Sequence, residues 1–257
     1  MPVVDFFHDT TPVFEPGKYT TDLFTDKARQ ILKANDAKND PSFIYLAYNA
    51  PHEPTHAPDH LIEKMRELHP TTEVSRLEHL ATVYHMDIQI EQLVEESKTF
   101  ERETIFIFQS DNGGATQKFR GKRTKEMRSC NYPYKGYKNT LYEGGTISPS
   151  FIYSTKTKFA RNRVNSVFHV MDWFPTILDF AGAKYRKLTH IDGVSQRPTL
   201  RSKFNPKPRE NFIYGLLNEF VDETKRKLIL KKLPNKVLTR LVMNFKNNPL
   251  QNIFISL

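Results

Sequence analysis

The amino-acid sequence predicts an α/β fold with a mixed or parallel sheet between layers of helices. Two runs of β-branched and aromatic residues, 43–48 and 104–108, have the composition of strands that a parallel sheet buries on both faces. Both runs end at a polar turn, and segments with the apolar spacing of helices lie before and between them. Strands that alternate with helices along the chain are typical of this fold class.

The first elements follow from local signals. Residues 1–17 contain several prolines and show no periodicity, so we expect an irregular lead-in. Thr20-Thr21-Asp22 offers N-caps for a helix that reaches about Ala34. After the strand at 43–48, we expect a helix over 59–68 and a long helix over 75–100. The long helix has apolar residues at three- and four-residue steps: Leu77, Leu80, Ala81, Tyr84, Ile88 and Val94.

The second half begins with the central strand at 104–108. Residues 150–153 suggest another strand, and 167–181 suggest a strand edge followed by a helix. Residues 184–209 are polar and rich in proline, as in a linker to a small C-terminal α+β subdomain. The expected organisation is therefore a lead-in over 1–17, an α/β domain over 18–200, and a C-terminal subdomain with a basic tail over 201–257.

Composition limits the class of protein. With 257 residues the chain is long enough for one large α/β domain or for most of one. Only 38% of the residues are hydrophobic, so the 19 Phe and 11 Tyr predict an aromatic-rich core. The net charge of +9 favours a polyanionic partner: by charge alone, sulfated polysaccharide, nucleic acid and anionic membrane all remain open.

Targeting and crosslinking signals are absent from the sequence. No apolar run approaches the roughly 20 residues that span a bilayer, so we expect no membrane span. The start, Met1 to Phe7, lacks the basic and apolar regions of a secretory signal. Cys130 is the single cysteine and excludes an internal disulfide. Taken literally, these features describe a cytosolic chain.

Polar residues gather directly after the central strand. Asp111-Asn112-Gly113-Gly114 stands where open α/β sheets bind their ligands, and it combines two oxygen donors with glycines that let the backbone turn closely. The segment 135–145 then brings cations and a second Gly-Gly turn. Asp-Asn-Gly is also ordinary turn chemistry. Together with a fixed ammonium, however, it predicts a site for an oxyanion held on a metal.

Segments in this region resemble the type I sulfatases, and within that family arylsulfatase B most closely. The matching segments, which stand in family order within about residues 19 to 230, are 45–54, 106–114, 138–145, 169–178 and 191–194. The resemblance implies an alkaline-phosphatase-like fold. It also implies calcium-dependent hydrolysis of sulfated sugars or aryl sulfates with a formylglycine nucleophile, in a lysosomal or secreted enzyme such as those of glycosaminoglycan degradation.

The resemblance also assigns roles to particular residues. His52 and Lys138 match residues that contact the sulfate group, so both are expected to be catalytic and substrate-binding. Asp111 and Asn112 match calcium ligands. For His52 the alternative is an exposed residue of a capped turn, and for Lys138 it is a surface cation.

One part of the family pattern is missing. The family's nucleophile is a cysteine in a Cys-x-Pro-Ser-Arg motif, which occurs nowhere in the sequence, and Cys130 is followed by Asn-Tyr-Pro. The family takes this motif, an Asp-Asp metal pair and a Lys-x-His segment from the half that precedes residue 1 here. We therefore expect a sulfatase fragment, inactive alone and with an incomplete Ca²⁺ shell, and we expect the missing elements and a signal peptide to be encoded upstream of Met1.

Rival hypotheses remain at this point. The chain could be an inactive polyanion-binding protein of this scaffold, or a phosphatase or phosphodiesterase of the same superfamily. The basic stretch at 118–128 resembles a nucleic-acid patch by composition, but a solvated loop beside the site is the preferred interpretation, and no nucleic-acid partner is expected. If half of the sheet is missing, strands 43–48 or 104–109 would have an open apolar edge and would promote self-association.

Overall fold

A computed structural model of the chain describes residues 6–116, 129–159, 163–183, 190–204 and 206–212, together with the backbone of 241–242 and 250–256. Its strands are β1 (Phe7–His8), β2 (Thr11–Pro12), β3 (Ser42–Leu46), β4 (Glu103–Gln109), β5 (Ser150–Ser154), β6 (Arg163–Val164), β7 (Leu241–Val242) and β8 (Leu250–Ser256). Its helices are α1 (Thr20–Ala37), α2 (Asp59–Leu68), α3 (Val74–Ser97), α4 (Glu143–Thr146), α5 (Trp173–Phe180) and α6 (Arg197–Arg201), with a 3₁₀ turn η1 (Val170–Asp172).

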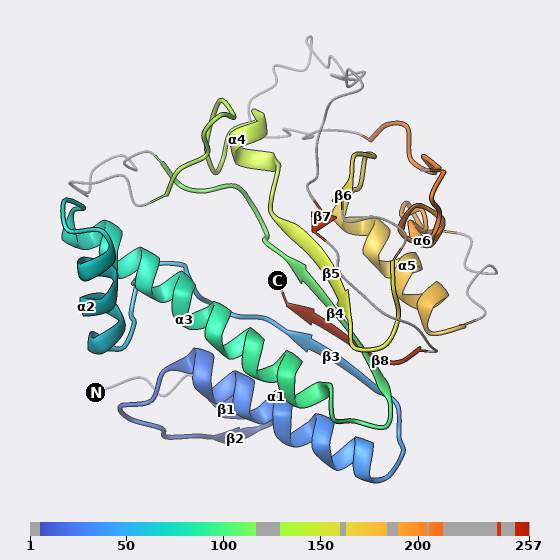
Figure 1. Cartoon of the computed structure of the whole chain (residues 1–257), viewed down its shortest axis with the longest axis horizontal. Helices are drawn as coiled ribbons and strands as arrows, with labels where there is room; N and C mark the ends of the chain where they lie inside the picture. Colours follow the sequence, from blue (N-terminus) through green and yellow to red (C-terminus); the bar gives the residue numbers. More distant parts are fainter. Residues whose placement is uncertain are drawn as a thin grey trace.

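The main sheet has six strands in the order β3-β8-β4-β5-β7-β6 (Figure 1). β8 is parallel to both β3 and β4, whereas β5 is antiparallel to β4. β1 and β2 form a separate antiparallel hairpin within the expected lead-in. The mixed sheet and its helices confirm the predicted α/β class.

Helices cover both faces of β4. On one face Phe106 packs with Leu32 of α1 and Leu93 of α3. On the other face Ile105 and Ile107 pack with residues of α5 and α6. Since successive side chains of a strand point to opposite faces, burial of both faces requires the unbroken apolar run seen in the sequence.

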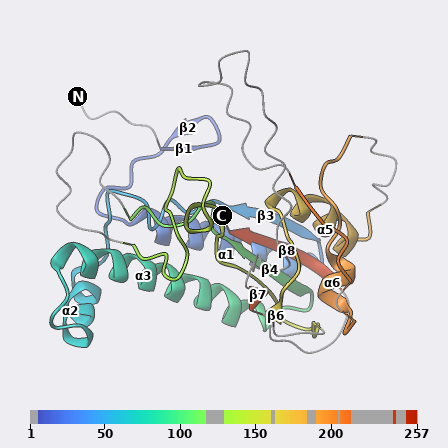
Figure 2. The same cartoon turned by 90° about the horizontal axis from the view of Figure 1, so that it is seen from above.

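The two ends of the molecule carry different helices. α2 lies at the end of α3 that is remote from α5 and α6 (Figures 1 and 2). Leu61 and Met65 of α2 pack on Leu77 and Ala81 of α3, with Ala57 beside them, and form a small core of their own. This core holds one end of the loop that follows β3. None of the helices in the described part of the chain is long and apolar enough to cross a membrane.

Several sequence expectations need correction. α1 is preceded by Tyr19 and has no side-chain cap, although Thr20-Thr21-Asp22 offered caps. The strand edge expected near 167 is replaced by an extended His169 that leads into η1. α4 and α6 were not expected. α4 is a single turn around a Gly-Gly pair, and such a helix depends on tertiary contacts because short helices are marginal by themselves.

The C-terminal region departs further from expectation. β7 and β8, which belong to the expected subdomain at 201–257, lie in the main sheet. β4 is consequently paired on both sides and is not an edge strand. β3 is bonded to β8 alone among the described strands, and its Phe43 and Tyr45 are 62% and 54% exposed. The predicted domain boundaries and the predicted self-association stay predictions. The described residues do not include the expected basic loop at 118–128 or residues 213–240.

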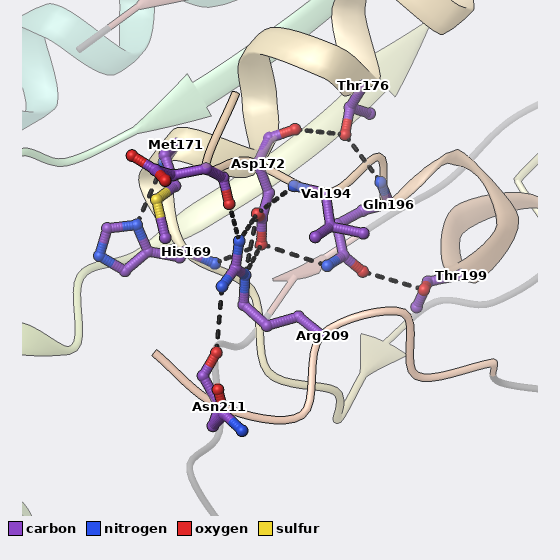
Figure 3. A network of polar contacts seen from close by, with 10 residues as sticks. His169, Met171, Asp172, Thr176, Val194, Gln196, Thr199, Arg209 and Asn211 are labelled. Carbon is purple, nitrogen blue, oxygen red and sulfur yellow. Dashed lines mark hydrogen bonds and ion pairs between the residues drawn. The ribbon is translucent and has the colours of Figure 1, made fainter. Parts of the chain in front are cut away.

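A buried polar network joins α5 to the segments that follow it (Figure 3). Asp172 is fully buried, and its carboxylate accepts hydrogen bonds from Nε and Nη2 of Arg209 at 2.7–2.9 Å. It also accepts bonds from the backbone N–H of Val194 at 2.8 Å and from Gln196 Nε2 at 3.2 Å. A buried charge with so many partners fixes the relative positions of Asp172 at the start of α5, the segment that holds Val194 and Gln196, and Arg209.

His169 caps the start of the 3₁₀ turn η1. Its Nδ1 accepts a hydrogen bond from the Met171 N–H at 3.3 Å, and its own backbone N–H donates to Asp172 at 2.9 Å. Burial lowers the pKa of His169 below its ordinary value of 6.5; Asp172 opposes this shift and Arg209 adds to it. The neutral ring that the cap needs is therefore the form that the fold favours.

We expect acidification to destabilise the protein through His169. Because its pKa is lower in the folded than in the unfolded state, the unfolded chain binds the proton more readily. The stabilisation is present above pH 6.5 and is lost as the pH falls through the folded-state value. Urea unfolding, followed by the fluorescence of the single tryptophan, Trp173, compares about pH 7.5 with about pH 5.5. His169→Asn keeps a capping acceptor without a titrating ring, so the free energy of unfolding should depend less on pH in this variant. If the pH dependence of stability is unchanged, it comes from other groups.

Candidate functional site

A cavity of about 1810 Å³ opens where β3 and β4 end. Its walls come from the start of α1, the loop after β3, the turn after β4, and residues 129–134 with Lys138. Most small-molecule sites have roughly 300–1,000 Å³. The cavity therefore has room for an extended ligand.

His52 lies in the loop after β3. Its backbone N–H donates to Asn49 O at 2.9 Å, and Asn49 is tied to α1 by a 2.9 Å bond from Thr20 Oγ1. The imidazole Nδ1 is 2.8 Å from the carbonyl oxygen of Glu53. Because a carbonyl only accepts, Nδ1 carries the proton of this bond. His52 lines the cavity with its Nε2 free of that contact.

Asp111 and Asn112 lie in the turn after β4. Ser110 fixes this turn: its N–H donates to Pro149 O and its hydroxyl to Asn112 O, both at 3.0 Å. The Nδ2 of Asn112 donates to Gly113 O at 3.1 Å, which leaves its Oδ1 available for a ligand. Both residues line the cavity.

The two Gly-Gly turns pack backbone against backbone. The N–H of Gly113 donates to Gly145 O at 3.0 Å, and that of Gly144 donates to Lys135 O at 2.8 Å. A Cβ on Gly113 would lie 2.0 Å from Gly144 O, a distance that real contacts do not show. Glycine is therefore required where the second turn approaches the first, and this contact brings the segment 135–145 beside Asp111.

Asn131 ties Lys138 to the same turn. Its Oδ1 accepts from the Gly114 N–H at 2.9 Å, and its Nδ2 donates to Gly114 O at 2.8 Å and to Gly136 O at 3.1 Å. The Lys138 N–H also donates to Gly114 O, at 3.1 Å. Sequence reasoning missed Asn131, and its place before a Pro-Tyr-Lys-Gly turn is the only signal that points to it.

Gln109 is a second anchor that the sequence did not reveal. Its Oε1 accepts from Trp173 Nε1 at 3.2 Å, and its Nε2 donates to Ser148 Oγ at 2.8 Å and to Ser110 O at 2.7 Å. The end of β4 is thereby held against α5 and against the chain that enters β5. Trp173 is 4% exposed and belongs to the core, as expected.

The charges of the site are available to a ligand. Within the described residues, the Asp111 carboxylate and the Lys138 ammonium form no ion pair with each other or with other side chains. The structure thus brings His52, Asp111, Asn112 and Lys138, which come from separate segments, to one cavity.

A complete metal site is not found in the described part of the chain, where no group of three or more His, Cys, Asp or Glu could hold an ion. Asp111 and Asn112 offer oxygen ligands, which suit Ca²⁺. Since Ca²⁺ normally takes six to eight oxygens, these residues alone do not fit it.

Comparison with known proteins decides the family. A family model described as "Sulfatase" matches residues 3–183. The chain belongs to the sulfatase family. It is 31% identical to the "Uncharacterized sulfatase YdeN" of Escherichia coli K12, over 77% of this chain and 34% of that protein. It is 28% identical to mouse "Arylsulfatase J", over 79% of this chain and 32% of that protein.

A solved structure resembles this sulfatase chain as well. It is described as Ps i-CgsB in complex with k-i-k-neocarrahexaose and has a TM-score of 0.60 and 25% identity, over 81% of this chain and 43% of that one. Mouse "N-acetylgalactosamine-6-sulfatase" is 26% identical over 70% of this chain and 32% of its own length. The chain spans about a third of the length of the curated sulfatases it matches.

Proposed function

We propose that this chain forms the sulfate-binding side of an arylsulfatase-like active site that acts on sulfate esters of sugars or on aryl sulfates. The observation that carries the proposal is the convergence of His52, Asp111, Asn112 and Lys138 on one cavity at the carboxyl ends of β3 and β4. This is the edge at which α/β sheets bind ligands. For the whole protein, the family resemblance favours a lysosomal or secreted location.

Lys138 and His52 would act on the sulfate group directly. The backbone of Lys138 is bonded to the turn that carries Asp111, and an ammonium placed there can neutralise negative charge on the sulfonyl oxygens. His52 has its Nδ1–H engaged by the Glu53 carbonyl, so Nε2 carries a proton only in the imidazolium form. Donation of a hydrogen bond from His52 to the ester therefore requires protonation of the ring.

Asp111 and Asn112 would contribute part of a calcium shell. In a complete shell, the ion would supply positive charge beside the sulfonate. The remaining ligands and the formylglycine nucleophile have to come from other residues, because these 257 residues contain no Cys-x-Pro-Ser-Arg sequence. We therefore expect the chain alone to bind sulfate without hydrolysing aryl sulfates.

The test is binding of inorganic sulfate to the full 257-residue chain, measured by calorimetry. Lys138→Ala should weaken binding about ten- to hundredfold, the value of a hydrogen bond from a charged group. Lys135→Ala is the matched control: Lys135 lies in the same segment, but its ammonium sits over the Tyr142 ring at 4.4 Å and does not line the cavity. Turnover of 4-nitrophenyl sulfate should equal the buffer blank.

Other results would favour other functions. Equal losses in Lys138→Ala and Lys135→Ala would indicate non-specific attraction of anions, and the inactive polyanion-binding protein would become the better hypothesis. Tighter binding of phosphate than of sulfate would favour a phosphatase or phosphodiesterase. Turnover above the blank would overturn the expectation that the chain alone is inactive.

A further inference from the structure

Tyr132 presents an aromatic ring at the mouth of the cavity. Its side chain is 88% exposed, yet it lines the same cavity as Lys138. The turn that carries it is fixed: Asn131 bonds to Gly114 and Gly136 as described, and Tyr134 N–H donates to Asn131 O at 2.7 Å. These bonds fix the backbone at Tyr132, so the ring stays attached at the edge of the cavity.

The neighbouring tyrosine differs. Tyr142 is 49% exposed, and its ring is covered by the Lys135 ammonium. Among the described residues, no ring or cation stacks on Tyr132. Because this open ring lines the cavity that holds the polar groups of the site, a ligand bound there can pack on its face.

We propose that Tyr132 is a stacking platform for a pyranose ring of a sulfated oligosaccharide whose sulfate group reaches Lys138. The proposal rests on the proposed function and narrows its substrate class. The C–H face of a pyranose is apolar and packs on an aromatic face, while its sulfate groups require cations. Tyr132 and Lys138 supply both within one cavity, whose volume of about 1810 Å³ exceeds the need of a small aryl sulfate.

The experiment uses the full chain and calorimetric titration of a sulfated carrageenan hexasaccharide, its desulfated form, 4-nitrophenyl sulfate and inorganic sulfate. Tyr132→Ala should weaken binding of the sulfated hexasaccharide about tenfold, as expected for one lost aromatic contact, and leave inorganic sulfate unchanged. Tyr132→Phe should keep the wild-type affinity. Phe204→Ala is the control for a merely exposed ring, because Phe204 is 95% exposed and lies outside the cavity.

Each contrary outcome has a distinct meaning. Unchanged affinity for the hexasaccharide in Tyr132→Ala would overturn the platform, and so would an equal loss for inorganic sulfate, because the substitution would then have disturbed the turn. An equal loss for 4-nitrophenyl sulfate would place the aryl leaving group on Tyr132 and overturn the sugar assignment. If Lys138→Ala has no effect while Tyr132→Ala weakens binding of the hexasaccharide, the proposed function fails and the contact between the sulfate group and Lys138 is overturned, but the sugar contact of Tyr132 stands.

Discussion

Asp172→Ala is expected to lower the free energy of unfolding by about 3–5 kcal/mol, the cost of removing one partner of a buried ion pair. The variant leaves Arg209, a residue that is only 8% exposed, without the carboxylate that its guanidinium binds. It also removes the acceptor for Val194 N–H and Gln196 Nε2. Urea unfolding measures this loss of stability. The fluorescence of Trp173, which follows Asp172 in the sequence, reports the transition.

Asp192→Ala is the matched control for this network. The Asp192 side chain is exposed, and only its backbone carbonyl accepts from Arg209 Nη2, at 2.7 Å, so we expect a change below about 0.5 kcal/mol. The double variant Asp172→Ala/Arg209→Met should lose less stability than the two single losses add up to, since no buried charge is left unpaired. Additive losses would show that the two residues do not act as a pair.

Gly113→Ala is expected to disrupt the site itself. The added Cβ would meet the Gly144 carbonyl oxygen at 2.0 Å, and backbone on both sides leaves no flexible group to move away. We expect a loss of about 3 kcal/mol in stability, at the upper end for overpacking, together with loss of the Gly113 to Gly145 hydrogen bond. Sulfate binding should weaken at least about tenfold, because Lys138 moves away from Asp111.

Gly182→Ala separates this clash from a general glycine effect, because Gly182 does not line the cavity. Nothing lies within 4 Å of its added Cβ, and its φ of +69° costs about 1 kcal/mol in an alanine. This variant should keep the wild-type affinity for sulfate. If Gly113→Ala behaves in the same way as Gly182→Ala, the close approach of the two turns is not what positions the site.

Local signals predicted many of the elements near the site. α2 has the bounds that were expected, and β3, β4 and β5 lie within two residues of the expected strands. A strand buried on both faces has to be apolar throughout, and an amphipathic helix has to repeat at three and four residues. These requirements act within a few neighbouring residues, so the sequence displays them directly.

The sequence did not predict which strands pair or which side chains hold the site together. β8 lies between β3 and β4, although residues 250–256 were expected in a separate subdomain. Asn131 and Gln109 hold the site through bonds to residues up to 64 positions away. Pairing of this kind depends on which surfaces meet after folding, and local periodicity contains no information about it.

The sequence by itself determined the chemical groups of the site. The polar turns that follow two apolar strands contain His52, Asp111 and Asn112, and the second Gly-Gly segment contains Lys138. Only the tertiary structure decided that these groups line one cavity and that Tyr132 is exposed beside them. The physical reason is that side-chain chemistry is a property of each residue, whereas the close approach of two Gly-Gly turns and the three hydrogen bonds of the Asn131 amide exist only when distant segments are packed together.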